Sequence, residues 1–345
     1  MTILDCERMR FDHCGLYSFC NYLGHALAKR QEEIRGGLGF YVPQDYIGHF
    51  GDYPYYKRLP LHKYWLWPRD VTLWHSTYQL THFMPHGVSV LQTVHDLNFL
   101  HEDVSASKRG DYCRRIERHL QKAVAIVAIS AFTRDELLQH IRVPAIPVHV
   151  IYNGCNHYNG HFSKPACVCQ RPFLFSVGTL LPKKNFHVLP PLLAVSDYDL
   201  YIAGRDYGYA ARILEEARRW GVEGRLHLMG AISEAEKHWM LKHCAAFLFP
   251  SLAEGFGLPV LEAMQYGKPV FLSTHTSLPE IGGKQAYYFN SEFDCCAMQE
   301  EFIAGMGHYT SHPQQSLLLR EHADKFSWDE AALEYIRLYN TYAIE

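Results

Sequence analysis

The second half of the chain repeats one pattern that restricts the fold more than any other feature of the sequence. In each repeat a short apolar run is followed by a turn and then by a helical pattern. The runs predict buried strands at 173–177, 200–203, 226–229, 246–249 and 270–272. Gly178, Gly204 and Gly230 lie just past three of them. Short strands that alternate with helices predict a parallel sheet covered by helices.

The first half shows the same alternation with less regular spacing. Apolar runs predict strands at 2–4, 38–42, 71–74, 88–94, 125–130 and 148–152. Residues 15–30 predict an amphipathic helix, because Leu16, Phe19, Cys20 and Leu23 recur at helical spacing. We therefore expect an α/β protein with two Rossmann-like domains that face each other across a deep cleft.

A polar stretch rich in Asn, Gly, His and Cys separates the two halves between residues 153 and 171. We place the first domain at 1–160 and the second at 161–325. Residues 326–345 predict a C-terminal helix that begins near Trp328, with Ser327 as its N-cap. We expect this helix to return toward the first domain.

Composition excludes several classes of protein. The 345 residues carry a formal net charge of −3, which argues against a nucleic-acid-binding protein that relies on a global basic field. Charged residues from Asp5 to Arg10 stand where a signal peptide would be apolar, and no run of about 18 apolar residues is present. The ten cysteines form no disulfide framework. We therefore expect a cytoplasmic protein with reduced thiols.

The segment SLAEGFGLPVLEAMQYGKPV at 251–270 carries the chemistry. It predicts a glycine-containing loop and then a helix with Pro259 in its first turn and Gly267 at its end. The start of such a helix favours a phosphate. The carboxylates of Glu254 and Glu262 suit the vicinal hydroxyls of a sugar or ribose. Taken alone, Glu254 could be a solvated loop carboxylate, and Glu262 could simply favour the N-terminus of its helix. The two together predict a nucleotide-sugar site.

With this segment in place, the chain resembles glycosyltransferase family 4, retaining enzymes with the GT-B fold. FSVGTLLPKKN at 175–185, LHLMGAISEAE at 226–236 and AFLFPSLAEGFGLPVLEAM at 246–264 are similar to the family's signatures. In the first half CGLYSF, VLQTVHDL and VAISAFTRDEL also look like family segments. The loop GTLLPKKN is closest in character to bacterial mannosyltransferases of cell-surface polysaccharide synthesis.

The resemblance implies roles for individual residues. The catalytic set would be Glu254 near the donor sugar hydroxyls, His95 near the donor sugar and Lys184 on the leaving diphosphate. Glu262 would bind the ribose. The remaining donor contacts would come from Gly15, Gly178, Thr179, Lys183, Arg205, Met229, Phe256, Gly257 and Leu258. Thr179 stands where many relatives carry an arginine, and Arg205 is the candidate substitute.

The substrates follow from the same resemblance. The expected donor is GDP-mannose, with UDP-glucose, UDP-N-acetylhexosamine and dTDP-rhamnose as alternatives. The expected acceptor is an oligosaccharide or a lipid-linked glycan in surface polysaccharide or lipopolysaccharide synthesis. Aromatic and basic residues mix between Asp52 and Asp70, which suits a membrane interface, sugar stacking or plain packing. Peripheral binding at the inner face of the plasma membrane is therefore expected.

Neither a metal nor a further cofactor is expected. Asp197 and Asp199 have D-x-D spacing but precede a predicted strand, and the pairs Cys167 with Cys169 and Cys295 with Cys296 lack zinc-site spacing. The alternatives are a phosphorylase or nucleotide-sugar epimerase, a non-catalytic nucleotide-sugar-binding member, and an NAD enzyme. The last lacks a G-x-G-x-x-G turn.

Overall fold

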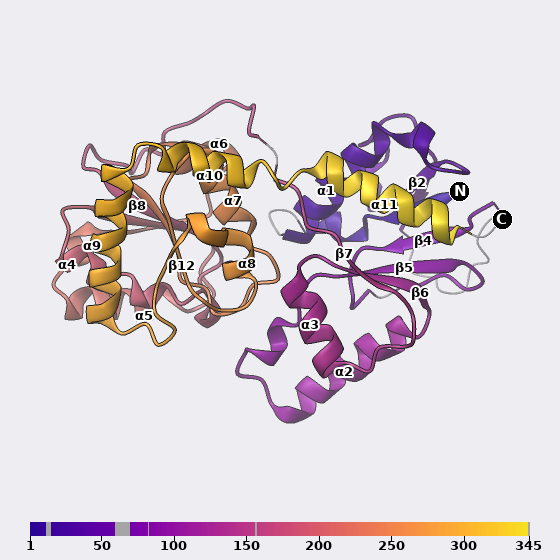
Figure 1. Cartoon of the computed structure of the whole chain (residues 1–345), viewed down its shortest axis with the longest axis horizontal. Coiled ribbons are helices and arrows are strands. Elements are labelled where there is room, and N and C mark those ends of the chain that lie inside the picture. Colours follow the sequence, from indigo (N-terminus) through magenta and orange to yellow (C-terminus); the bar gives the residue numbers. More distant parts are fainter. Residues whose placement is uncertain (12–14, 59–69, 82, 156, 344–345) are drawn as a thin grey trace. The chain divides into compact units, whose positions relative to one another are not determined.

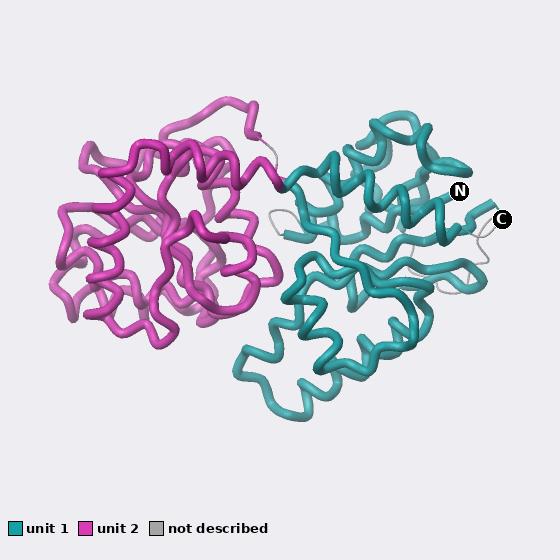
Figure 2. Tube along the Cα trace, viewed as in Figure 1, with its two compact units in different colours: residues 1–154, 326–345 teal, residues 155–325 magenta. Residues whose placement is uncertain are grey.

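The computed structural model describes residues 1–11, 15–58, 70–81, 83–155 and 157–343. The chain forms two compact units (Figure 2). The first contains Met1–Gly154 together with Phe326–Glu345, and the second contains Cys155–Lys325. Most of the aromatic and basic stretch at 52–70 lies outside the described residues, as does Cys14 of the CGLYSF segment.

The first unit is built on a parallel sheet whose strand order, over the described residues, is β3-β2-β1-β4-β5-β6-β7. The strands are β1 (Thr2–Asp5), β2 (Leu38–Val42), β3 (Tyr55–Lys57), β4 (Leu73–Ser76), β5 (Ser89–Val94), β6 (Ala123–Ala128) and β7 (Val148–Val150). The helices are α1 (Gly15–Ala28), α2 (Ala106–Leu120), α3 (Ala131–His140) and α11 (Trp328–Tyr342). In Figure 1, α1 and α11 lie on one side of the strands and α2 and α3 on the other.

The second unit is also built on a parallel sheet, with the order β10-β9-β8-β11-β12-β13 across the described strands. These are β8 (Phe173–Val177), β9 (Asp199–Ala203), β10 (Leu226–Gly230), β11 (Ala246–Phe249), β12 (Val270–Leu272) and β13 (Tyr287–Tyr288). The helices around it are α4 (Pro191–Ala194), α5 (Ala210–Arg219), α6 (Glu234–His243), α7 (Leu258–Gln265), α8 (Leu278–Gly282), α9 (Cys295–Ser311) and α10 (Gln315–Ala323). The α/β class with two parallel Rossmann-like sheets is thus confirmed.

Local sequence signals explain where the helices begin. Ser130 caps α3 by accepting from Thr133 N–H, and Ser233 forms a capping box with Glu236 at the start of α6. Ser327 caps α11 by accepting from the N–H groups of Asp329 and Glu330, as predicted.

No helix in the described part of the chain is both long enough and apolar enough to cross a bilayer.

The C-terminal helix α11 belongs to the first unit, where it packs against α1. Its buried face repeats at helical spacing and consists of Trp328, Ala331, Ala332, Tyr335, Ile336 and Tyr339. A Cβ at Gly154 would lie 2.0 Å from the backbone nitrogen of Trp328. The chain therefore needs glycine at the point where its first long segment ends, because the returning helix begins against it.

Candidate functional site

The strand order of the second unit creates a topological switch point at the carboxyl ends of its strands. The chain runs from β8 outward to β9 and β10, then crosses back to β11 and continues to β12 and β13 on the other side. The loops that follow β8 and β11 therefore diverge at their carboxyl ends. In open α/β sheets ligands bind in the crevice at such a switch point.

The two loops at this switch point are joined through Lys183. Its backbone carbonyl accepts from Leu252 N–H at 2.7 Å and from the Ser251 hydroxyl at 3.2 Å. In both contacts the acceptor is the backbone carbonyl of Lys183. The β8 loop is therefore fixed to the β11 loop whatever side chain residue 183 carries.

Lys184 and Glu254 form an ion pair across the same two loops. Their side chains are only 15% and 14% exposed, so the pair is largely shielded from water. The Lys184 ammonium also lies 5.1 Å from the centre of the Phe249 ring. Two of the three residues assigned to catalysis are therefore in direct contact, with a cation and a carboxylate side by side at the switch point.

The turn after β12 holds the Glu254 loop from behind. Thr276, with a left-handed φ of 53°, accepts from Glu254 N–H at 3.0 Å through its hydroxyl. The Ser277 hydroxyl donates to the carbonyls of Glu254 at 3.0 Å and Phe256 at 3.2 Å. The backbone around Glu254 is thus fixed by side chains from another loop, which pre-organises its carboxylate.

The backbone geometry of the second unit requires glycine at positions 204 and 257, of which only Gly257 belongs to the predicted donor set. A Cβ at Gly204 would lie 1.8 Å from the carbonyl oxygen of Gly178, so the loops after β8 and β9 meet only because residue 204 has no side chain. Gly257 has a φ of 103° and starts α7, where no side chain caps the helix. Phe256 is buried and Leu258 half-buried at this helix start, and an uncapped helix N-terminus favours an anion.

Glu262 lies in α7 and pairs with a residue that the sequence did not reveal. The Lys237 ammonium of α6 lies 2.9 Å from Glu262 Oε1 and 2.9 Å from Glu234 Oε2. Burial lowers the pKa of Lys237, but Glu262 and Glu234 outweigh it, and the net shift is upward. Glu262 Oε2 is buried and makes no hydrogen bond within the described residues. The Glu262 carboxylate is therefore held by Lys237 through one oxygen, while its second oxygen is left without a hydrogen bond among the described residues.

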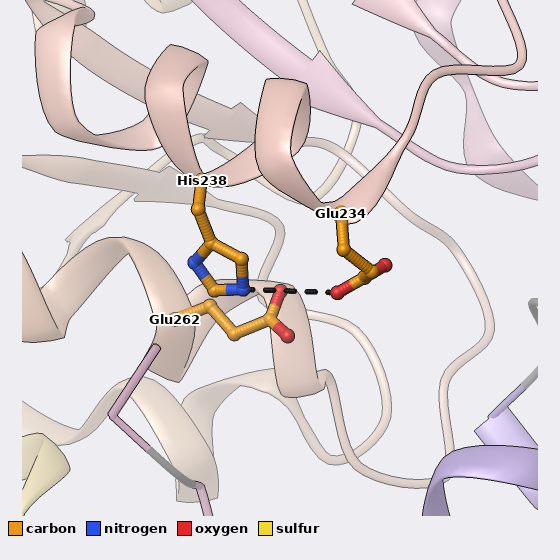
Figure 3. Close-up of side chains that lie close together, drawn as sticks. All are labelled: Glu234, His238 and Glu262. Atoms are coloured by element: carbon orange, nitrogen blue, oxygen red, sulfur yellow. Dashed lines mark ion pairs between the residues drawn. The ribbon is translucent and has the colours of Figure 1, made fainter. Parts of the chain in front are cut away.

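Three possible metal ligands also meet here, Glu234, His238 and Glu262 (Figure 3). The Lys237 ammonium already bridges both carboxylates, so a divalent cation would have to displace it. Burial and then Lys237 lower the pKa of His238 to about 4, so the imidazole is neutral at pH 7 and its 3.7 Å contact with Glu234 carries no ion pair. This chemistry fits a salt-bridged carboxylate better than a metal centre.

The other donor candidates of the second unit lie along the same sheet edge. Thr179 is half-buried directly after Gly178, and Met229 is half-buried near the end of β10. Arg205 is exposed, and its carbonyl accepts from Leu180 N–H at 2.9 Å. Asp199, by contrast, starts β9 at the opposite end of the strands, where it contacts Arg171 and His227. The D-x-D spacing of Asp197 and Asp199 therefore lies away from the switch point, at the end of the sheet that the sequence indicated.

His95 and Gly15 belong to the first unit. His95 follows β5 and is buried, and its Nε2 donates to the Thr77 carbonyl at 2.7 Å. Because a carbonyl only accepts, Nε2 carries the proton and Nδ1 is the accepting nitrogen. Burial lowers the pKa of His95 to about 4 despite that bond. Gly15 is exposed at the start of α1, and a Cβ there would meet nothing within 4 Å.

Comparison with known proteins agrees with this geometry. The family model for "Glycosyl transferases group 1" matches residues 162–289, and that for "Glycosyltransferase Family 4" matches residues 24–158. The chain belongs to glycosyltransferase family 4. Its fold is GT-B, as in the crystal structure of Anabaena HepE in complex with UDP-glucose, which is 15% identical and gives a TM-score of 0.71 over 99% of both chains.

Curated relatives in this family include several bacterial mannosyltransferases. The chain is 24% identical to O-antigen chain mannosyltransferase B of Escherichia coli over 74% of its own length and 72% of that protein. It is also 24% identical to a GDP-mannose:cellobiosyl-diphosphopolyprenol alpha-mannosyltransferase of Komagataeibacter xylinus, over 74% of this chain and 65% of that one. Of the longer Escherichia coli mannosyltransferase WbdA the chain spans only 28%.

Proposed function

We propose that this protein is a retaining hexosyltransferase that moves mannose from GDP-mannose to a glycan or glycolipid acceptor in the synthesis of a surface polysaccharide or lipopolysaccharide. The observation that carries the proposal is the Lys184–Glu254 pair at the switch point of the second unit. The mannosyltransferase relatives support the choice of sugar.

The donor would lie across the loops of the second unit. Its diphosphate would meet the uncapped start of α7 and the Lys184 ammonium, while its ribose hydroxyls would donate to the Glu262 carboxylate. Lys184 must then share its charge between Glu254 and the diphosphate. This exchange would free a Glu254 oxygen for a hydroxyl of the donor sugar.

The reaction breaks the bond between the sugar C1 and the β-phosphate oxygen, which leaves with the electron pair. The acceptor hydroxyl forms its bond to C1 on the same face, which retains configuration, and its proton passes to the departing phosphate oxygen. Lys184 and the α7 N-terminus stabilise the charge that develops on the diphosphate. We propose that this positive charge makes a metal unnecessary; turnover that stops on treatment with EDTA would contradict this.

His95 is suited to binding rather than to proton removal. Its pKa of about 4 makes the imidazole a weak base, but the fixed tautomer presents Nδ1 as an acceptor. We propose that Nδ1 accepts a hydrogen bond from a hydroxyl of the donor sugar. Gly15 and the exposed Arg205 remain candidates for the diphosphate.

The experiment combines donor binding with transfer. Calorimetry against GDP-mannose, UDP-glucose, UDP-N-acetylglucosamine and dTDP-rhamnose should show the tightest binding for GDP-mannose. Glu262→Ala should weaken donor binding about tenfold or more, whereas Lys184→Ala should mainly lower kcat. Lys242→Ala on α6, which is exposed, is the control.

The outcomes separate the possibilities. If no nucleotide-sugar binds, the proposed function is wrong. If another donor binds best, the sugar is wrong but the site stands. A protein that binds its donor normally yet transfers sugar to no acceptor would be a non-catalytic nucleotide-sugar-binding member.

A further inference from the structure

A basic hollow of about 440 Å³ lies in the first unit at the C-terminal end of α2. Its lining residues are Thr81, Arg115, Arg118, His119 and Lys122. Three of these carry a permanent positive charge, and none carries a carboxylate. The protein as a whole has a formal net charge of −3, so this local excess of positive charge runs against its general composition.

The acids on α2 do not neutralise the hollow. Asp111 pairs with Arg114, and the Glu117 carboxylate accepts from Arg142 N–H at 3.1 Å. Within the described part of the chain, no carboxylate pairs with Arg115, Arg118 or Lys122. The acidic side chains available on this helix are therefore engaged elsewhere.

Helix stability does not account for the cluster either. Arg118 lies three residues after Arg115 on α2, a spacing at which like charges repel by a few tenths of a kcal/mol, and Lys122 follows just beyond the helix end. The helix dipole offsets this only over the last turn of α2, which ends at Leu120. Arg115 precedes the last turn of α2, so the helix dipole does not stabilise its charge. A bound anion would supply the negative charge that this cluster of cations lacks.

The wall of the hollow connects to the loop of His95. His119 Nδ1 donates to the Gln79 carbonyl at 2.9 Å. The side chain of the same Gln79 accepts from His95 N–H at 3.1 Å and donates to the Asp96 carbonyl at 2.8 Å. Burial lowers the pKa of His119, and Lys122, Arg115 and Arg118 lower it further, in agreement with a positive potential in the hollow.

We propose that this hollow binds the diphosphate group of the acceptor. The inference rests on the proposed function and takes the glycolipid as its acceptor. A sugar-diphosphate diester carries two negative charges, which two or more of the three cations can meet with charge-assisted hydrogen bonds. The hollow is concave and includes the buried Thr81, which suits an inserted group better than the plane of a bilayer. The donor diphosphate has its own place in the second unit.

The test uses inorganic pyrophosphate as the probe and the full chain saturated with GDP, so that the donor site is filled. Arg118→Gln with Lys122→Gln should weaken pyrophosphate binding at least about tenfold in calorimetry. The matched control is Lys108→Gln with Arg114→Gln, which removes the same charge from α2 outside the hollow. The control should bind pyrophosphate like the unaltered protein, and circular dichroism should show all three folded.

Two results would overturn the assignment. One is equal pyrophosphate binding by both double variants. The other is a hollow variant that loses only flotation with phosphatidylglycerol vesicles, since the anions recognised would then be bilayer headgroups. In either case unchanged GDP-mannose binding would leave the proposed function standing. Failure of the unaltered protein to bind any nucleotide-sugar would instead remove the function itself.

Discussion

At the scale of single residues, each glutamate of the 251–270 segment is matched by a lysine from another element. Glu254 pairs with Lys184 of the β8 loop, and Glu262 pairs with Lys237 of α6. A shielded carboxylate without a counter-charge is costly, so each lysine offsets the cost of shielding its partner from water. Lys237 escaped sequence reasoning because its partner is 25 residues away, and only the helical EAEK at 234–237 hints at a paired lysine.

Replacing Lys237 with Met should therefore damage both stability and donor binding. The Glu262 carboxylate would keep its place but lose its counter-charge. Because the pair is about 15% exposed, we expect a loss of about 1–3 kcal/mol rather than the full cost of a buried pair. Donor affinity should fall about tenfold, as measured by calorimetry.

A second substitution separates the two effects. Lys237→Met combined with Glu262→Gln should regain most of the stability in urea titrations but none of the donor affinity. Lys242→Met on the same helix should leave donor affinity unchanged. Full donor binding by the double variant would show that the Glu262 carboxylate does not contact the donor.

Gly204→Ala should be among the most damaging small substitutions in the second unit. The added Cβ would fall 1.8 Å from the carbonyl oxygen of Gly178, a backbone atom that cannot turn away. We expect a loss of about 2–4 kcal/mol in chemical denaturation. Gly224→Ala, where a Cβ meets nothing within 4 Å, is the control, and equal midpoints for the two variants would contradict the packing of these loops.

At the scale of elements, most strands were predictable, and the exceptions are two short edge strands. The runs 38–42, 173–177, 246–249 and 270–272 coincide with β2, β8, β11 and β12, because strands covered on both faces are continuously apolar. The edge strands β3 and β13 are short and tyrosine-rich, with no apolar run to mark them. The predicted strand at 71–74 is shifted, since β4 begins at Leu73 and continues into the polar His75 and Ser76.

Of these two polar residues, His75 is covered by the returning helix α11. His75 is fully buried, with Nδ1 2.6 Å from the Tyr339 hydroxyl and Nε2 2.7 Å from the Thr93 hydroxyl. Burial, and then His95, lower the pKa of His75 to about 3. A buried polar residue in a strand interrupts the apolar pattern from which strands are predicted. The sequence does not show that a distant helix supplies its hydrogen-bond partner.

The docking of α11 should therefore weaken in acid. The pKa of His75 is about 6.5 in the unfolded chain and about 3 in the folded one, so between these values the unfolded state binds the extra proton. The contribution of neutral His75 to stability is full above pH 6.5 and is lost as the pH falls toward 3. His75→Asn should reduce the slope of unfolding free energy against pH by about 1.4 kcal/mol per pH unit between pH 6 and about 4. An unaltered slope would contradict the buried, neutral state of His75.

At the scale of the whole molecule, each unit has its own sheet and its own core. A cluster around Ile116, Ile126 and Leu137 lies between β5, β6 and the helices α2 and α3, and a separate one around Leu174, Leu200 and Leu248 fills the second unit. The sequence shows two such units through its repeated alternation. The units divide after Gly154, which lies against Trp328, and no local pattern in the sequence displays this long-range contact.

This organisation predicts which part of the chain is independent. The fragment 155–325 contains a complete parallel sheet with its covering helices, together with Lys184, Lys237, Glu254 and Glu262. Expressed alone, it should fold with a cooperative denaturation transition and bind GDP, within about tenfold of the affinity of the full chain.

Residues 1–154 alone should be unstable, because the faces of α1 and β4 that α11 covers would be exposed. Joining 326–343 to residue 154 through a flexible linker should restore folding of the first unit. A folded 155–325 fragment that binds no nucleotide would move the donor site out of the second unit, and a stable 1–154 fragment would show that α11 is dispensable for its core.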